Sequence, residues 1–211
     1  MNRIALLAGI AASTTAIAGP GLQITEAYIG LSGQDGTADW IEVTNFGPAP
    51  ANLMGLFYDD SSADPTEGGD LPNIDLGAGE SIVILIEAGA SDIADFEAIW
   101  GTGINVIAVA GGGGLGQGGD AAVIIDAMSN IIDVVATPNV PDGEFGTVQF
   151  DIDGNGVFST VGLNGAYLSA AFENDNFGTI QLIGNPGFIP APAGFALLGL
   201  GGLTAARRRR A

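Results

Sequence analysis

The sequence predicts an all-β domain, a small β-sandwich with one short helix. Three observations lead to this prediction: apolar and polar residues alternate, turn residues separate the apolar runs, and a single segment has helical spacing. The alternation is clearest in residues 39–60, which predict two strands around a turn at 45–51. The first strand should place Ile41 and Val43 on one face and Trp40, Glu42 and Thr44 on the other, and the second strand contains Leu53, Leu56 and Tyr58.

The remaining elements follow from the same patterns. Strands are expected at 22–28, 81–87, 106–110, 121–126, 131–136, 145–152, 165–172 and 179–183, with a turn at 174–178. The continuous apolar run at 82–86 predicts a strand that is buried on both faces. Ser91 is expected to cap a helix over 91–100, because acidic residues follow in its first turn. Its apolar side should pack on the sheets through Ile93, Phe96 and Ile99 or Trp100.

The charges of this chain are distributed unevenly. It contains 24 acidic residues, no lysine, and five arginines at positions 3 and 207–210. If both ends are removed or membrane-embedded, the remaining body has 24 acids and no basic residue. Such a body repels phosphate backbones, since nucleic-acid binding depends on Lys and Arg. We therefore predict no nucleic-acid partner, whereas divalent cations would be attracted.

Two residue types are missing altogether. The absence of cysteine excludes disulfides, thiolate zinc sites and cysteine nucleophiles, and the absence of histidine excludes serine–histidine triads and histidine metal sites. Any catalysis would depend on carboxylates or tyrosine. A carboxylate-based hydrolase, or an accessory module of one, is therefore one alternative, but the sequence singles out no pair of acids for it.

The N-terminal segment has the features of a signal peptide. Residues 1–18 contain an early arginine, an apolar run, and the small residues Ala16 and Ala18 at a predicted cleavage site. The chain is thus expected to divide into a signal peptide at 1–18, a domain at 19–188 and a sorting or anchor segment at 189–211.

The C-terminal segment combines three signals. Pro190 and Pro192 precede an apolar stretch at 193–206, and four arginines follow, Arg207, Arg208, Arg209 and Arg210. As a helix the stretch would span about 21 Å, less than the bilayer core of about 30 Å, so transient insertion is expected, with the arginines cytoplasmic. The segment resembles the PEP-CTERM sorting tail, with Ala191 where that motif usually has Glu. The resemblance implies processing by an exosortase-like sorting protease; a simple C-terminal anchor is the alternative.

A succession of short blocks over residues 22–136 resembles the bacterial lamin-tail domain. The blocks include Ile24-Thr25-Glu26, the run from Asp39 to Asn45, 52–56, 76–80, 96–101, 118–126 and 130–133. The resemblance implies an immunoglobulin-like β-sandwich. It also implies an accessory or adhesive module of an exported bacterial protein, and it carries over no catalytic residues.

Two loops have residue spacings that are typical of ligand sites. The glycine-rich segment 111–119 has the spacing of a dinucleotide loop, but a strand rather than a helix is expected to follow it. In residues 151–159, Asp151, Asp153 and Asn155 stand at positions that suit Ca²⁺, and Gly156 permits a sharp turn. The alternative for this loop is an acidic hairpin turn. A second acidic group, Asp59, Asp60, Asp64 and Glu67, is a weaker calcium candidate.

Together these features predict an exported protein of the cell envelope surface or extracellular matrix. Its expected function is structural or adhesive and non-enzymatic, with calcium as the candidate ordering ion. The envelope or an exopolysaccharide matrix is the expected partner. The other alternative, a glycan- or protein-binding module, would require an exposed aromatic platform, and both tryptophans are expected in the core.

Overall fold

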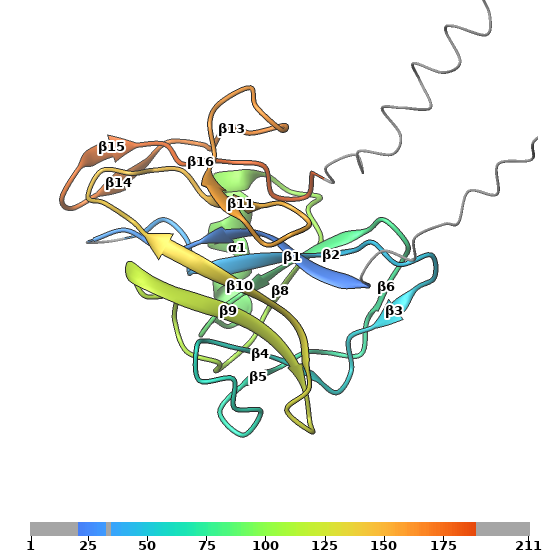
Figure 1. Ribbon diagram of the computed structural model, residues 1–211. Helices are drawn as coiled ribbons and strands as arrows, with labels where there is room; N and C mark the ends of the chain where they lie inside the picture. Colours follow the sequence, from blue (N-terminus) through green and yellow to red (C-terminus); the bar gives the residue numbers. More distant parts are fainter. Residues whose placement is uncertain (1–20, 33–34, 189–211) are drawn as a thin grey trace, which may run out of the picture.

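The computed structural model describes residues 21–32 and 35–188. The predicted signal peptide at 1–18, with Ala16 and Ala18, and the predicted sorting tail at 189–211, with its prolines and arginines, lie outside the described residues. The described part is mostly β-strand with one short helix, which confirms the all-β prediction (Figure 1). Within it, no helix has the length and apolar character needed to cross a membrane.

The larger sheet has six strands. Their order is β12 (Gly156–Phe158), β11 (Val148–Phe150), β1 (Leu22–Tyr28), β2 (Trp40–Asn45), β7 (Ser81–Leu85) and β8 (Val106–Ala108). Neighbouring strands are antiparallel except β7 and β8, which are parallel. The strands β1, β2 and β7 therefore lie inside the sheet, with neighbours on both sides.

A second sheet has four antiparallel strands, in the order β10 (Ile131–Asn139), β9 (Gly118–Asp126), β4 (Leu56–Asp59) and β5 (Gly69–Asp70). Three further pairs are short: β3 (Ala51–Asn52) with β6 (Asp75–Leu76), β13 (Tyr167–Leu168) with β16 (Ile183–Gly184), and β14 (Phe172–Asn174) with β15 (Gly178–Ile180). In Figure 1 the four-stranded sheet lies below β1 and β2, and the pairs β13–β16 and β14–β15 lie above them.

The two larger sheets share one hydrophobic core. Ile41 and Val43 contribute to it from β2, and Tyr58 and Ile124 contribute from the opposite sheet. The face predicted for Ile41 and Val43 is thus confirmed. Their neighbour Trp40 belongs to a different core on the other face of β2, as the alternation predicted.

The second core lies between the six-stranded sheet and helix α1 (Ala90–Trp100). The fully buried Trp40 ring meets the edges of Phe96 and Trp100, with ring centroids 5.9 and 6.1 Å apart. On β7, Val83 and Leu85 enter this core while the alternate residues enter the first one. The prediction that this strand is buried on both faces is therefore confirmed.

The helix is where the sequence predicted it, but its cap is not. Gly89 is the N-cap residue, and its N–H donates to the Asp92 carboxylate at 2.6 Å. The prediction that Ser91 caps the helix is wrong, because the helix begins at Ala90 and Ser91 is already inside the first turn. Asp92 supplies the acidic group that helix N-termini favour.

Beyond β10 the strands are shorter than predicted. The expected strand at 145–152 contains only β11. Those at 165–172 and 179–183 are reduced to short segments, in which β13 pairs with β16 and β14 forms a hairpin with β15. The turn predicted at 174–178 is present between β14 and β15.

The buried aromatic cluster generates a stability prediction. Replacing Trp40 by alanine is expected to lower the free energy of unfolding by about 3–5 kcal/mol, since it leaves a cavity under helix α1. Met54→Ala is the control; that side chain is 66% exposed, and its loss should change stability by less than about 0.5 kcal/mol. Denaturant unfolding measures both, and equal small effects would contradict the packing described.

Candidate functional site

The site begins with an irregularity in β1. The pairing of β1 with β2 shifts between Ile24, which opposes Val43, and Glu26, which opposes Glu42. Thr25 is the extra residue of a β-bulge, and a bulge of this kind lets two successive side chains point to the same side. The Thr25 hydroxyl contacts the Glu42 carboxylate at 2.9 Å, so both Thr25 and Glu26 lie on the face away from the first core.

The bulge places three polar side chains in one row across three neighbouring strands. Glu26 lies opposite Gln149 of β11 on one side and opposite Glu42 of β2 on the other. All three are at least nine-tenths buried. Two carboxyl groups therefore stand side by side in the interior of the protein.

The C-terminal segment, residues 183–188, covers this pair. One Glu26 oxygen, Oε1, accepts a hydrogen bond from the Asn185 N–H at 2.9 Å and another from the Thr147 hydroxyl. Glu42 Oε2 accepts from the Gly187 N–H. The two carboxyl groups thus hold the main chain of the C-terminal segment against the central sheet.

One of the four carboxyl oxygens of Glu26 and Glu42 differs from the other three in its hydrogen bonding. Glu26 Oε2 is buried and has no hydrogen-bond partner among the residues that the structure describes. A buried polar atom without a partner is costly, by about 1–3 kcal/mol, and native structures contain few of them. This atom therefore marks the place where the row of side chains is incomplete.

Burial controls the ionisation of the pair. It raises the pKa of Glu26 to about 8, helped by the charge of Glu42 and opposed by hydrogen bonds from Thr147 and Asn185. It likewise raises the pKa of Glu42 to about 7, against the hydrogen bonds from Gly187 and Thr25. Residues 21–188 contain no Lys, Arg or His, so protons rather than basic side chains neutralise these carboxyls.

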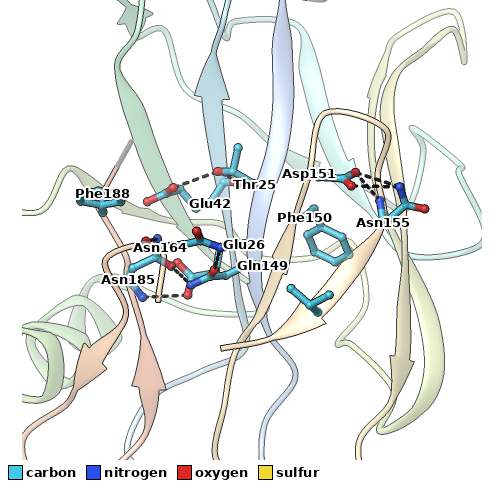
Figure 2. Close-up of a pocket in the computed structure, with 11 residues that line it drawn as sticks. Thr25, Glu26, Glu42, Gln149, Phe150, Asp151, Asn155, Asn164, Asn185 and Phe188 are labelled. Carbon is cyan, nitrogen blue, oxygen red and sulfur yellow. Dashed lines mark hydrogen bonds between the residues drawn. The ribbon is translucent and has the colours of Figure 1, made fainter. Parts of the chain in front are cut away.

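A cavity of about 230 Å³ opens beside the pair (Figure 2). Its walls come from β1, β2, the β11–β12 hairpin, the loop before β13 and the C-terminal segment. The lining residues are Thr25, Glu26, Glu42, Gln149, Phe150, Asp151, Asn155, Val157, Asn164, Asn185 and Phe188.

Three carboxamides form a connected wall of this cavity. Gln149 donates to the Asn185 side-chain oxygen at 2.7 Å, Asn164 donates to the Gln149 oxygen at 3.3 Å, and Asn185 donates to the Asn164 carbonyl at 2.9 Å. Figure 2 shows the three amides gathered beside Glu26. The wall therefore presents hydrogen-bond donors and acceptors close together.

The predicted calcium residues lie partly on this cavity. Asp151 and Asn155 line it, but they bind each other: the Asn155 main-chain and side-chain N–H groups donate to the Asp151 carboxylate at 2.9 and 3.1 Å. These hydrogen bonds lower the pKa of Asp151. The loop closes the β11–β12 hairpin, with Asp153 exposed in it. Calcium binding here stays a prediction.

The other motifs of the sequence lie away from the cavity. Asp59 accepts from the Ser62 hydroxyl and the Asp64 N–H, both at 2.6 Å, which are contacts that shape its own loop. The glycine-rich segment leads into the strand β9 and not into a helix, as predicted. Among the residues that the structure describes, no group of three or more Asp and Glu side chains is arranged to hold a metal ion.

The sequence does not predict that Glu26 and Glu42 form a pair. A signal was present, because each is an acid inside a strand whose neighbours are apolar, and Glu42 shares the predicted face of Trp40. The bulge at Thr25 brings Glu26 to the same face, and no residue type in β1 predicts that bulge.

Comparison of the sequence with protein-family models and with curated proteins found no match.

The raised pKa values generate a prediction about pH. The folded protein binds more protons than the unfolded chain between the unfolded value of 4.5 and the folded values of about 7 and 8. Stability from these groups is complete below pH 4.5 and is lost as the pH rises through 7 and 8. We expect the free energy of unfolding to be at least about 2 kcal/mol lower at pH 8.5 than at pH 5.

An isosteric variant isolates this effect from general repulsion between the acids. Glu26→Gln should flatten the fall in melting temperature between pH 5 and 8.5, since the amide cannot ionise. Asp95→Asn removes one charge from the exposed face of α1 and should leave the fall unchanged. The same slope in both variants would show that Glu26 is not the titrating group.

Proposed function

We propose that this protein is an exported, non-enzymatic structural or adhesive module of the cell envelope surface or extracellular matrix. Its two facing sheets are interpreted as an immunoglobulin-like β-sandwich of the lamin-tail kind. The observation that supports this function best concerns the hydrogen bonds of the buried carboxyl pair, Glu26 and Glu42. Both carboxyls bind the main chain of residues 183–188, which fastens the end of the domain to its central strands.

That fastening suits a domain that is held through its C-terminus. The predicted sorting tail begins at residue 189, immediately after the fastened segment. A pull on the tail would act first on hydrogen bonds to β1 and β2, which are interior strands of the six-stranded sheet. The exosortase-like protease and the envelope or polysaccharide matrix remain the proposed partners.

The hydrolase alternative has weaker support. Glu26 and Glu42 do stand side by side at a cavity, as a pair of catalytic carboxyls would. However, three of their four oxygens accept hydrogen bonds from the protein itself. Only Glu26 Oε2 remains, whereas a glycoside hydrolase needs two carboxyls that are both free to act on the substrate.

Cell fractionation tests the proposed location. The full chain should be recovered in the envelope or matrix fraction without residues 1–18. A variant lacking residues 189–211 should be exported but released into the soluble fraction. Replacing Pro190 and Pro192 by alanine should weaken retention if they form the sorting motif. Recovery of the full chain in the cytoplasm with its N-terminus intact would contradict the proposal.

Calcium is the proposed ordering ion at Asp151, Asp153 and Asn155. A ligand that binds only the folded form stabilises it by mass action. We expect excess Ca²⁺, but not Mg²⁺, to raise the melting temperature relative to chelator, and Asp153→Ala to remove the rise. Asp95→Asn is the charge-matched control. An unchanged melting temperature in Ca²⁺ would exclude this loop as a calcium site and leave the structural proposal standing.

A further inference from the structure

Glu26, which lines the cavity, has a buried oxygen that makes no hydrogen bond within residues 21–32 and 35–188. This oxygen is Oε2, while its sister oxygen Oε1 accepts two hydrogen bonds. With Oε1 occupied as an acceptor, the proton of the neutral carboxyl belongs on Oε2. This oxygen can therefore donate a hydrogen bond to a ligand in the cavity.

The surrounding side chains fit hydroxyl groups. A hydroxyl both donates and accepts, and the cavity wall offers both kinds of group from the carboxamides of Gln149, Asn164 and Asn185. The Glu42 carboxyl and the Thr25 hydroxyl lie on the same wall. A ligand with several hydroxyls on a small frame could use these groups together.

An aromatic ring stands at the edge of this polar wall. Phe188 lines the cavity and is 45% exposed, unlike the buried tryptophans. One side of its ring is backed by Gly165, where an added Cβ would lie 2.7 Å from the ring. Gly165 thus lets the main chain lie close against Phe188. The ring is the exposed aromatic platform that a glycan-binding module requires, provided by a phenylalanine.

The volume and the charge of the cavity limit the kinds of ligand that it can hold. A volume of about 230 Å³ equals roughly eight waters and is smaller than the sites of drug-sized ligands, so it suits one ring rather than a long chain. Three carboxyls in the wall, those of Glu26, Glu42 and Asp151, oppose an anionic group, and residues 21–188 contain no basic residue to attract one. The ligand is therefore expected to be uncharged.

We propose that this cavity binds a single neutral sugar residue, with hydroxyls on Glu26 and the carboxamides and a ring face on Phe188. This inference rests on the proposed function, because it names the matrix component that an exported adhesive module would hold. Because only one sugar ring fits the cavity, the sugar that binds should be the end or a branch of a polysaccharide.

Titration followed by NMR tests the proposal. The purified full chain is titrated with neutral hexoses, an N-acetylhexosamine and a hexuronate. At least one neutral sugar should bind saturably and shift the side-chain amide signals of Gln149, Asn164 and Asn185. The amide of Asn105, which lies outside the cavity lining, should not move. The hexuronate should bind at least about tenfold more weakly than the neutral sugar.

Variants of Phe188 test directly whether its ring contacts the sugar. Phe188→Ala should weaken sugar binding about tenfold, and Phe188→Trp, which keeps a ring, should restore it. Met54→Ala, an exposed apolar side chain elsewhere, should have no effect. Unchanged binding in Phe188→Ala, or binding without shifts in the three amides, would overturn the proposal.

Other outcomes separate this inference from competing ones. Amide shifts with Ca²⁺ alone and with none of the sugars would overturn it in favour of a cation. Cleavage of a methyl glycoside would overturn a binding-only site. A chain that reaches the envelope but binds no sugar would refute the cavity proposal alone, whereas a cytoplasmic chain that binds sugar would refute the proposed function.

Discussion

The central strands β2 and β7 are buried on both faces, and the rest of the structure depends on covering both. The four-stranded sheet covers one face and completes the first core. Helix α1 and the segments after β12 cover the other, around Trp40. Because apolar burial is the main favourable term in folding, the protein cannot be reduced to its two sheets. Residues 145–182 contribute side chains to the second core and therefore belong to the fold.

The bulge at Thr25 turns Glu26 outward from the first core and places it beside Glu42 in this second layer. There the covering segment binds through hydrogen bonds to carboxyls instead of through apolar contacts. Such contacts are directional, so they fix the position of the segment more closely than apolar packing would. A small cavity lies beside these contacts.

Residues 21–188 contain no basic side chain, which gives these carboxyls an unusual setting. In most proteins a buried acid is paired with Lys, Arg or His, which lowers its pKa. Here burial and the neighbouring acid raise it, so protonation neutralises Glu26. Burial also raises the pKa of Asp39, at the start of β2, to about 7. The same composition that makes the surface strongly acidic therefore makes the interior sensitive to pH near neutrality.

The sequence by itself determined the strand class, the two faces of β2, the doubly buried β7 and the buried side of α1, because periodicity of apolar residues reports directly on burial. It did not determine how the short strands after β12 pair, since β13 meets β16 across the intervening β14–β15 hairpin, or the cap at Gly89. The cavity was decided by tertiary structure alone. Register and a bulge bring Glu26 beside Glu42, and residues 183–188 reach them from more than a hundred positions away. Pairings between residues so distant leave no periodic trace in the chain.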